Sequence, residues 1–514
     1  MKVNNRRKIA EGAALLGISA IIVKIIGVIY KVPLSYILGD DGMGYFNSAY
    51  AVYTLFFMLS TAGVPKAITI IVSKNEAEFE NKSYSIVKTL SLFFLFVGLI
   101  ICFLFYIFAS PISKFISNVG ALHTMYAIAP SIPFLCLGGV LRGYLIGKTS
   151  FLAVAFSELI SGLSKLVFGL VFAVYSSSRN LPLEEISAYT MLGITIGSIL
   201  CLIPLVISVH NKRGGTASIN KIKTVKEALK LTLPITISSL LSGLAGVIDL
   251  TLIMRGLVSS GYSNEVANVI YGNYTTLAIP MFTLATTLIS QIATSLLPAI
   301  ARENSNENKG NGTSFAMFLA FFIAFPIAIF YFLFPKDVLG ILFEEGSVAL
   351  GAIYLSSIAP SILLIAPLTV INTTLEAEGK VTLPVISLTL GSCVKLIISA
   401  LCISNVKIGI FGASLGTFFS YLVPLFISAS YMKRKITYKI RFAECFFIPA
   451  FSSIMSVICG LFIRPVLQNI ESYRLKSLSF LISLCLIYLF LSAILSKKLL
   501  NTTFKYGKVN KRSA

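Results

Sequence analysis

The sequence predicts an all-α polytopic membrane protein with about 14 transmembrane helices, arranged as two six-helix lobes followed by two C-terminal helices. Three observations predict this class. Hydrophobic residues make up 56% of the chain and charged residues only 12%, whereas about a quarter of the residues in a soluble domain are charged. The 514 residues fall into apolar runs long enough to span a bilayer. Lys and Arg gather in alternate breaks between these runs.

The apolar runs, taken in order, give the expected helices. Several of them exceed the length needed to cross the hydrocarbon core, so we expect tilts or kinks at Pro33, Pro65, Pro234 and Pro280. The expected spans are 13–38, 45–72, 86–110, 122–147, 150–176, 186–209, 229–257, 266–300, 314–335, 349–375, 382–406, 408–432, 444–463 and 477–496.

The basic residues test the number of spans. If both termini are cytoplasmic, the inner segments hold a roughly fourfold excess of Lys and Arg over the outer segments, as the positive-inside rule predicts. The net charge of +21 therefore reflects membrane topology and contact with anionic lipid, and we expect no nucleic-acid partner. The sequence predicts a multi-pass protein of the cell membrane with both termini cytoplasmic.

A basic break after the sixth expected helix indicates how the chain is divided. Related signals recur on either side of it, such as "GVIYK" at Gly27 and "GVIDL" at Gly246, which is typical of a parallel repeat about the membrane normal. The expected division is an N-terminal lobe 1–209, a cytoplasmic linker 210–228, a C-terminal lobe 229–432, and two further helices with a basic tail, 433–514.

Several lysines lie deep within expected spans. Lys24, Lys165 and Lys395 stand about 14 or more residues into their helices, a depth of roughly 20 Å that is too great for easy escape to the interface. Lys31 follows Lys24 by seven residues and shares its helix face. We therefore expect these lysines to face an aqueous cavity.

Four other charges lie within spans. Asp249 and Glu158 are acids at depth, and either can pair with a lysine from another helix. Arg142 and Arg255 lie nearer to helix ends, where long side chains can reach the interface. The lysines outnumber the acids, so the expected cavity has a positive surplus suited to an anion. A set of purely structural ion pairs is the alternative reading.

The sequence contains few residues of the types that enzymes use for catalysis or metal binding. The only histidines are His123 and His210, and no carboxylate cluster suits a metal-dependent transferase. The eight cysteines lack CxxC spacing and are expected to pack as small apolar groups. The sequence therefore predicts no catalytic residue, metal site or cofactor, and it indicates transport driven by a gradient or by the membrane potential.

Helix 122–147 carries a small-residue stripe, "GGVLRGYLIGKTS". Gly139, Gly143 and Gly147 recur every four residues, which allows a neighbouring helix to approach closely. The end of this stretch resembles a phosphate-binding loop that is one residue short and follows no strand, so nucleotide binding is not expected.

Three stretches carry a family resemblance: 24–74, beginning "KIIGVIYKVPLSYILGDDGMGYFNSAYAVY", 141–169, beginning "LRGYLIGKTS", and 271–303, beginning "YGNYTTLAIP". Together they resemble the stage V sporulation protein B group of polysaccharide exporters, in the superfamily that also holds the MATE transporters and lipid II flippases. The resemblance covers essentially the whole chain. It implies two six-helix lobes around a central cavity, two extra C-terminal helices and alternating access on a lipid-linked oligosaccharide.

The resemblance also has departures. Ile146 stands where the family has Gln, and Ser161 stands where the family has Glu, with Glu158 one turn earlier. Two arginines that help lipid II flippases bind substrate have no counterpart around Phe57 or around Tyr274 and Thr275. Lys24, in contrast, matches a basic position of their first helix.

The predicted function is translocation of an undecaprenyl-pyrophosphate-linked oligosaccharide, either a lipid II-like peptidoglycan precursor or a polysaccharide unit. The candidate substrate-binding residues are Lys24, Lys31, Lys165, Lys395, Arg142 and Arg255, and the candidate ion-coupling or structural residues are Asp249 and Glu158. Expected partners are the anionic lipid-linked sugar, the bilayer and cell-wall synthesis proteins. Two alternatives remain open: a multidrug or cation antiporter of the same fold, and a non-transporting scaffold in envelope or spore assembly.

Overall fold

The computed structural model describes most of the chain, and its described residues form helices without any strand, which confirms the predicted all-α class. The residues outside the description are 1, 62, 75–82, 212–218, 303–304, 344, 381, 406, 436–440, 471 and 510–514. Internal packing divides the chain into two compact units, 1–272 (unit 1) and 273–514 (unit 2). The predicted linker 210–228 falls partly on 212–218, outside the described residues, and the predicted lobe boundaries stay predictions.

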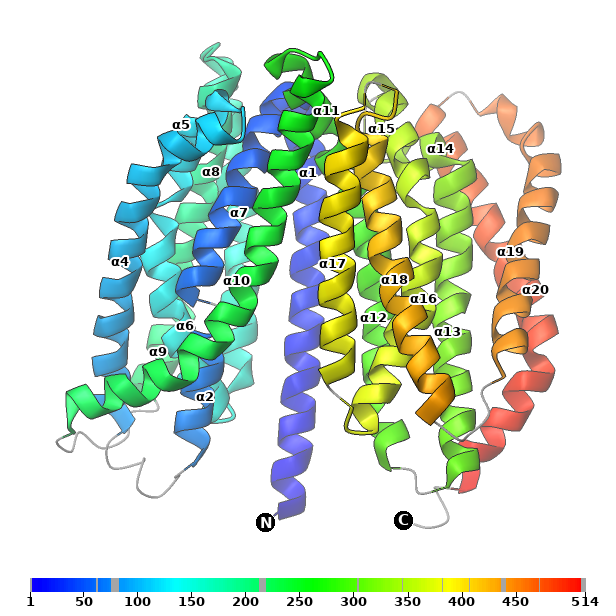
Figure 1. Ribbon diagram of the computed structural model, residues 1–514, viewed down its shortest axis with the longest axis horizontal. Coiled ribbons are helices and arrows are strands. Elements are labelled where there is room, and N and C mark those ends of the chain that lie inside the picture. Colours follow the sequence, from blue (N-terminus) through cyan, green and yellow to red (C-terminus); the bar gives the residue numbers. More distant parts are fainter. Residues whose placement is uncertain are drawn as a thin grey trace. The chain divides into compact units, whose positions relative to one another are not determined.

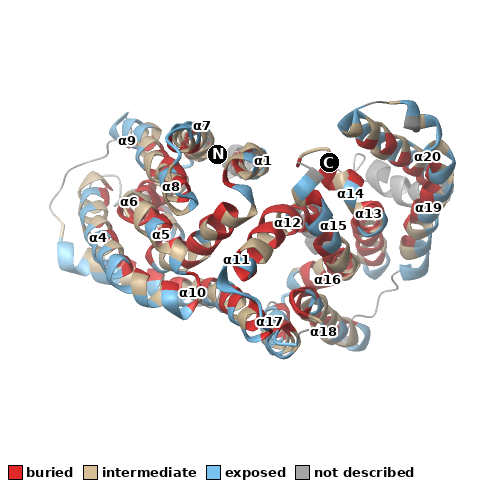
Figure 2. Cartoon of the chain, turned by 90° about the horizontal axis from the view of Figure 1, so that it is seen from above, coloured by how far each residue is buried: buried red, intermediate tan, exposed pale blue. Residues whose placement is uncertain are grey.

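Unit 1 consists of helices packed side by side (Figure 1). The view in Figure 2 shows their buried faces directed towards one another and their exposed faces turned outwards. In chain order they are α1 (Lys2–Thr61), α2 (Val64–Lys74), α4 (Ser83–Phe115), the short turn η1 (Val119–Ala121), α5 (Leu122–Ile128), α6 (Ser131–Gly147), α7 (Phe151–Ser178), α8 (Leu183–Leu200), α9 (Leu202–Asn211), α10 (Lys221–Ser259) and α11 (Asn264–Asn273).

Helix α1 is broken at one glycine. Gly39 has φ 62° and ψ −175°, a conformation outside the helical region that glycine adopts without steric cost. The break falls between the expected spans 13–38 and 45–72, so the first part of α1 covers the first span and the second part covers the start of the second. A second break precedes α2, where Pro65 occupies the first turn of a new helix. The sequence predicted the first break as a boundary between spans and the second as a kink at Pro65.

The glycine stripe of α6 packs against α2, as its spacing predicts. A Cβ atom added to Gly143 would lie 2.6 Å from the carbonyl oxygen of Pro65, and one added to Gly147 would lie 2.6 Å from Cβ of Val72. The hydroxyl of Thr69 also donates a hydrogen bond to the Gly143 carbonyl at 3.0 Å. These contacts require the small residues and bring the two helix backbones close together.

The outward surface of unit 1 is apolar, as expected for contact with lipid. On α4, Leu92, Phe96 and Phe103 are 61%, 61% and 65% exposed. The opposite face of the same helix buries Leu90 and Phe94 in the core of the unit. An exposed face of large apolar side chains this long would be unstable in water, and it fits a bilayer environment.

Unit 2 is also helical. Its elements are a π-helical turn η2 (Tyr274–Ala278), α12 (Ile279–Arg302), α13 (Asn306–Leu333), α14 (Pro335–Gly340), α15 (Glu345–Ile358), α16 (Pro360–Ala377), α17 (Thr382–Ile403), α18 (Phe411–Lys435), α19 (Phe442–Ile463), the short turn η3 (Val466–Asn469) and α20 (Tyr473–Val509). Helix α12 packs against α13 and α16, and α17 packs along α18.

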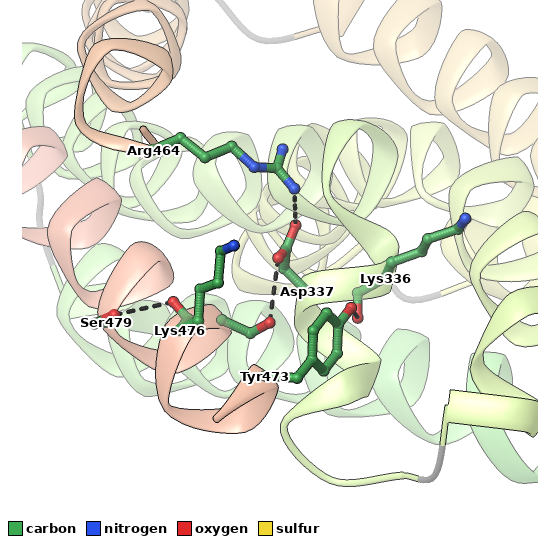
Figure 3. A network of polar contacts seen from close by, with 7 residues as sticks. Lys336, Asp337, Arg464, Tyr473, Lys476 and Ser479 are labelled. Atoms are coloured by element: carbon green, nitrogen blue, oxygen red, sulfur yellow. Dashed lines mark hydrogen bonds and ion pairs between the residues drawn. The ribbon is translucent and has the colours of Figure 1, made fainter. Parts of the chain in front are cut away.

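The last two helices are fastened to α13 and α14 by polar and aromatic contacts. Arg464 Nη2 lies 3.2 Å from Asp337 Oδ2, and the Ser477 hydroxyl donates to the other carboxylate oxygen of Asp337 at 3.2 Å. The guanidinium of Arg464 also stands over the rings of Phe334 and Phe480. Figure 3 shows Arg464 and Asp337 directed towards one another at this junction.

The described residues contain fewer candidate spans than the 14 expected. Within the described residues, 11 helical segments are long and apolar enough to cross a membrane, or 12 if the pair Val119–Ile128 and Ser131–Gly147, bent by 44°, is one span. The first of these segments, Leu15–Val72, extends over both of the first two expected spans. The structure thus confirms a polytopic membrane protein, while fourteen spans and cytoplasmic termini stay predictions.

Candidate functional site

A cavity of about 610 Å³ lies within unit 1. Both parts of α1 line it, together with α6, α7 and α8. Its walls are mainly apolar and aromatic, with four ionisable groups among them: Lys24, Arg142, Glu158 and Lys165. Ligand sites commonly combine an apolar lining with a few polar groups in a cavity of this size. We therefore take this cavity as the candidate functional site.

Lys165 is held by two aromatic rings. Its ammonium nitrogen stands 5.2 Å from the ring centre of Tyr30 and 4.9 Å from that of Tyr50. The two tyrosines lie on opposite sides of the break at Gly39 in α1, so Lys165 of α7 contacts both parts of that helix. Lys165 makes no ion pair with any described residue. The rings therefore orient this cation without neutralising it.

Arg142 is held by neutral groups as well. Its Nε donates to the Ser157 hydroxyl at 3.3 Å, and its Nη2 lies 3.7 Å from the Cys201 sulfur. Both partners are buried, and they belong to α7 and to the junction of α8 and α9. The side chain that could have reached the interface instead turns towards the cavity. Its charge is not paired with any carboxylate in the described part of the chain.

Glu158 lies on the same wall as Lys165, as their seven-residue spacing predicts. The buried Ser19 hydroxyl donates to Glu158 Oε2 at 3.0 Å and ties α7 to α1. Lys24, on α1, also lines the cavity. With three cations and a single carboxylate among these four groups, the cavity has a net positive formal charge.

A series of aromatic side chains lies along the second part of α1, and the sequence did not single it out as part of a site. Successive ring centres lie about 6 Å apart from Phe46 through Tyr50 and Tyr53 to Phe57. The last three of these side chains line the cavity. Their spacing of three and four residues puts them on one helix face, which was a readable signal, although a buried core stripe gives the same pattern.

Two of the predicted cations lie elsewhere. Lys31 donates a hydrogen bond from Nζ to Asn47 Oδ1 at 3.1 Å and does not belong to the described cavity lining. Arg255, on α10, donates from Nε to the Phe115 carbonyl at 2.6 Å and stands over the Phe115 ring, at the end of α4. The structure thus separates Lys31 from Lys24 although both occupy one face of α1.

The other two predicted site residues also fall outside the described lining. Asp249 belongs to α10 of unit 1, and Lys395 belongs to α17 of unit 2, where its charge interacts with Tyr421. The structure therefore brings together Lys24, Arg142, Glu158 and Lys165, four of the eight predicted residues. Among the described residues, no group of three or more His, Cys, Asp or Glu side chains could hold a metal ion.

Comparisons with known sequences show a family whose profile matches more than half of the chain. Residues 9–302 match the profile described as polysaccharide biosynthesis protein, and residues 234–401 match the MatE profile. The stage V sporulation protein B of Bacillus subtilis (strain 168) is 22% identical over 476 residues, 90% of each chain. The lipid II flippase MurJ of the same organism is 22% identical over 487 residues, 88% of this chain and 87% of the other.

Solved structures share the fold. The lipid II flippase MurJ in an inward closed conformation aligns with a TM-score of 0.72 at 17% identity, covering 95% of this chain and all of that one. An inward-facing MATE multidrug transporter of the MOP superfamily aligns with a TM-score of 0.61 at 13% identity, covering 81% and 94%. These matches confirm the predicted fold class.

Proposed function

We propose that this chain, which belongs to the polysaccharide biosynthesis protein family, is a flippase that moves an undecaprenyl-pyrophosphate-linked oligosaccharide across the cell membrane by alternating access. The name of one relative, a lipid II flippase, and the description of the family, polysaccharide biosynthesis protein, support the substrate class. The fold shared with MurJ and with a MATE transporter supports the mode of transport.

The observation that carries the proposal is the charge of the unit 1 cavity. Lys24, Arg142 and Lys165 line it with one acid, Glu158. Arg142 and Lys165 are held by hydroxyl, thiol and aromatic groups, so their positive charges are oriented but not cancelled. Keeping such charges within a membrane is costly unless they meet water or an anion. A pyrophosphate is an anion that these groups can bind together.

The cations suit different parts of that task. Arg142 has a planar guanidinium that can make two parallel hydrogen bonds to a phosphate, and Ser157 holds its plane in place. Lys24 and Lys165 act as point charges that follow the phosphates as the cavity changes shape. Lys31, Lys395 and Arg255 stay proposed contacts for other steps of the transport cycle.

Transport needs a driving force. The membrane potential favours outward movement of a negative headgroup by about 2.3 kcal/mol per charge per 100 mV when the inside is negative. The prenyl tail can remain in lipid while the headgroup crosses through the cavity. No nucleotide is required for this step.

The cavity is compatible with more than one lipid-linked sugar. Phe57 lines the cavity near a position where lipid II flippases have an arginine, so the headgroup contacts of this chain differ from theirs at that point. The aromatic rings of Tyr53 and Phe57 offer apolar surface of the kind that packs against sugar rings. A peptidoglycan precursor and a polysaccharide unit both satisfy these features.

A cation antiporter is the alternative with support on the same wall, because Glu158 lines the cavity and accepts a hydrogen bond from Ser19. Three cations around a single carboxylate would repel a cationic drug, which disfavours this function. A scaffold without transport would have no use for a positively charged cavity.

The test is flipping of fluorescent undecaprenyl-pyrophosphate sugars by the purified full chain in liposomes with an imposed potential. Wild type is compared with Lys24→Ala and Arg142→Gln, and Lys114→Ala serves as a control because Lys114 is exposed at the far end of α4, outside the described cavity lining. We expect flipping by wild type and by the control, and loss in the two cavity variants.

Two outcomes would contradict the proposal. Wild type that folds, but flips none of several pyrophosphate-linked sugars, would favour the antiporter, and Glu158→Gln with a drug-efflux assay would then be the next measurement. Equal flipping by all variants would remove the cavity cations from the mechanism.

A further inference from the structure

A second, smaller cavity of about 230 Å³ opens at the end of unit 1 where α4 begins and α9 ends. Helices α4 and α9 form its two walls, and Leu141 of α6 forms part of its floor. No residue lines both this groove, called the α4–α9 groove below, and the larger cavity. The groove is therefore a separate feature that the proposed transport site does not use.

The outer end of the groove is polar and positively charged. Lys88 of α4 and His210 in the last turn of α9 lie on opposite walls, and both side chains are exposed. Lys88 makes no hydrogen bond or ion pair with a described residue. Helices α4, α6 and α9 contain no Asp or Glu at all, so no carboxylate on these walls competes for the two side chains.

The inner part of the groove holds a buried hydroxyl without a partner. Ser91 lines the groove, and its hydroxyl is buried and has no hydrogen-bond partner among the described residues. A buried hydroxyl without a hydrogen-bond partner is destabilising, so a ligand oxygen within its reach would be stabilised. Lys88 and Ser91 lie three residues apart on α4 and therefore share a face, as Val206 and His210 do on α9.

Beyond these polar groups the walls become apolar and face outwards. Leu92 and Val206 both line the groove and are 61% and 51% exposed. Each lies one turn deeper along its helix than Lys88 or His210. A cationic rim that leads within one turn to exposed apolar side chains is the arrangement found at the boundary between lipid headgroups and acyl chains.

We propose that the α4–α9 groove binds an anionic phospholipid, with its headgroup phosphate between Lys88 and His210 and an oxygen of the lipid accepting a hydrogen bond from Ser91. The first part of an acyl chain lies against Leu92 and Val206. The flanking segments 75–82 and 212–220 carry Lys82, Lys212 and Arg213 together with three glutamates of 75–82, and we place this end of unit 1 in the cytoplasmic leaflet because basic residues of short loops mark that side and anionic lipids attract basic groups there. A bound lipid joins the ends of α4 and α9, which contact α6 on either side.

The test is native mass spectrometry of the purified full chain, titrated with dioleoyl phosphatidylglycerol or dioleoyl phosphatidylcholine. These lipids share acyl chains and differ in headgroup charge. We expect wild type to bind phosphatidylglycerol about tenfold more tightly than phosphatidylcholine, which corresponds to about 1.4 kcal/mol. In the double variant Lys88→Gln/His210→Gln the preference falls to within twofold.

The matched control is Lys114→Gln/His123→Gln, which removes the same two residue types from exposed positions outside the groove, on α4 and α5. It keeps the full preference. A second variant, Ser91→Ala, removes only the hydroxyl, and we expect it to weaken the binding of phosphatidylglycerol about threefold. The proposal can therefore be tested even if the double variant is poorly folded. No preference in wild type, or an unchanged preference in both groove variants, overturns the proposal.

Inorganic phosphate distinguishes a lipid site from a site for free phosphate. Inorganic phosphate is added at about 10 mM, in large excess over micromolar lipid. If the groove binds lipid, phosphatidylglycerol stays bound, because phosphate makes no apolar contact with Leu92 and Val206. Displacement of the lipid by phosphate would show that the apolar wall contributes nothing. This binding measurement is independent of flipping, so its failure leaves the transport proposal standing.

Discussion

Two arginines, one in each unit, show how differently this protein treats a positive charge. In unit 2, Arg464 forms an ion pair with Asp337, a carboxylate that also accepts a hydrogen bond from Ser477 (Figure 3). In unit 1, Arg142 is held by Ser157 and Cys201, which carry no charge. The first arrangement neutralises the cation and fastens helices together. The second orients the cation and keeps its charge available for a ligand.

Lys165 follows the pattern of Arg142 with a different chemistry. Two tyrosine rings, and no carboxylate among the described residues, surround its ammonium group. Arg464 also stands over two rings, but with Asp337 beside it. Aromatic contact by itself therefore does not distinguish a ligand site from a structural one in this chain. The distinguishing feature is whether a carboxylate lies beside the cation.

The largest expected effect is on transport in Arg142→Gln. Removing one charge-assisted contact to a pyrophosphate should slow flipping by roughly 10- to 100-fold, since such hydrogen bonds contribute about 1.5 to 3 kcal/mol. Arg464→Gln should flip within twofold of wild type, because its charge is already neutralised by Asp337. Initial flipping rates in liposomes measure both. Equal losses in the two variants would break the distinction between the arginines.

Arg464, in contrast, should matter for the stability of the protein and not for transport. Arg464→Ala leaves the buried carboxylate of Asp337 with the Ser477 hydroxyl as its remaining partner in the described contacts, which should cost about 1 to 3 kcal/mol. We expect a lower thermal unfolding midpoint for Arg464→Ala in detergent, and partial recovery in Arg464→Gln/Asp337→Asn, where both charges are gone. A midpoint equal to that of wild type would show that this ion pair does not fasten the C-terminal helices.

The tyrosines around Lys165 allow a finer test. Tyr50→Phe keeps the ring and should flip at nearly the wild-type rate, whereas Tyr50→Leu removes it and should slow flipping by about fivefold. The ratio of the two variants isolates the ring from the hydroxyl. If both variants are equally slow, the hydroxyl and not the aromatic contact positions Lys165.

The smallest expected effect belongs to Ser157→Ala. This change removes the hydroxyl that accepts from Arg142 Nε but leaves the guanidinium in the cavity. Flipping should fall by about two- to fivefold, because this hydrogen bond is long at 3.3 Å and contributes roughly 0.5 to 1 kcal/mol. The loss should vanish in the Arg142→Gln background, where Ser157 has no cation to orient. An additive loss in the double variant would assign Ser157 a separate role.

The sequence alone determined the membrane class, the all-α fold and the depth of the charged residues, because apolar content and residue spacing are local properties of the chain. It also indicated the glycine stripe of α6 and the break at Gly39, both of which the structure contains. It predicted the break before α2 only as a kink at Pro65 within one span, since the run 45–72 is apolar on both sides of Gly63 and Pro65.

Only the tertiary structure decided which charges share a cavity. Helical periodicity tells which residues occupy one face of a helix, but not which neighbouring helix that face meets. Lys24 and Lys31 share a face of α1, yet the first lines the cavity and the second binds Asn47. Arg142 looked able to reach the interface, and Ser157 and Cys201, distant in sequence, draw it towards the cavity. The neutral partners that leave these cations available for an anion are contributed by other helices, so no local pattern could reveal them.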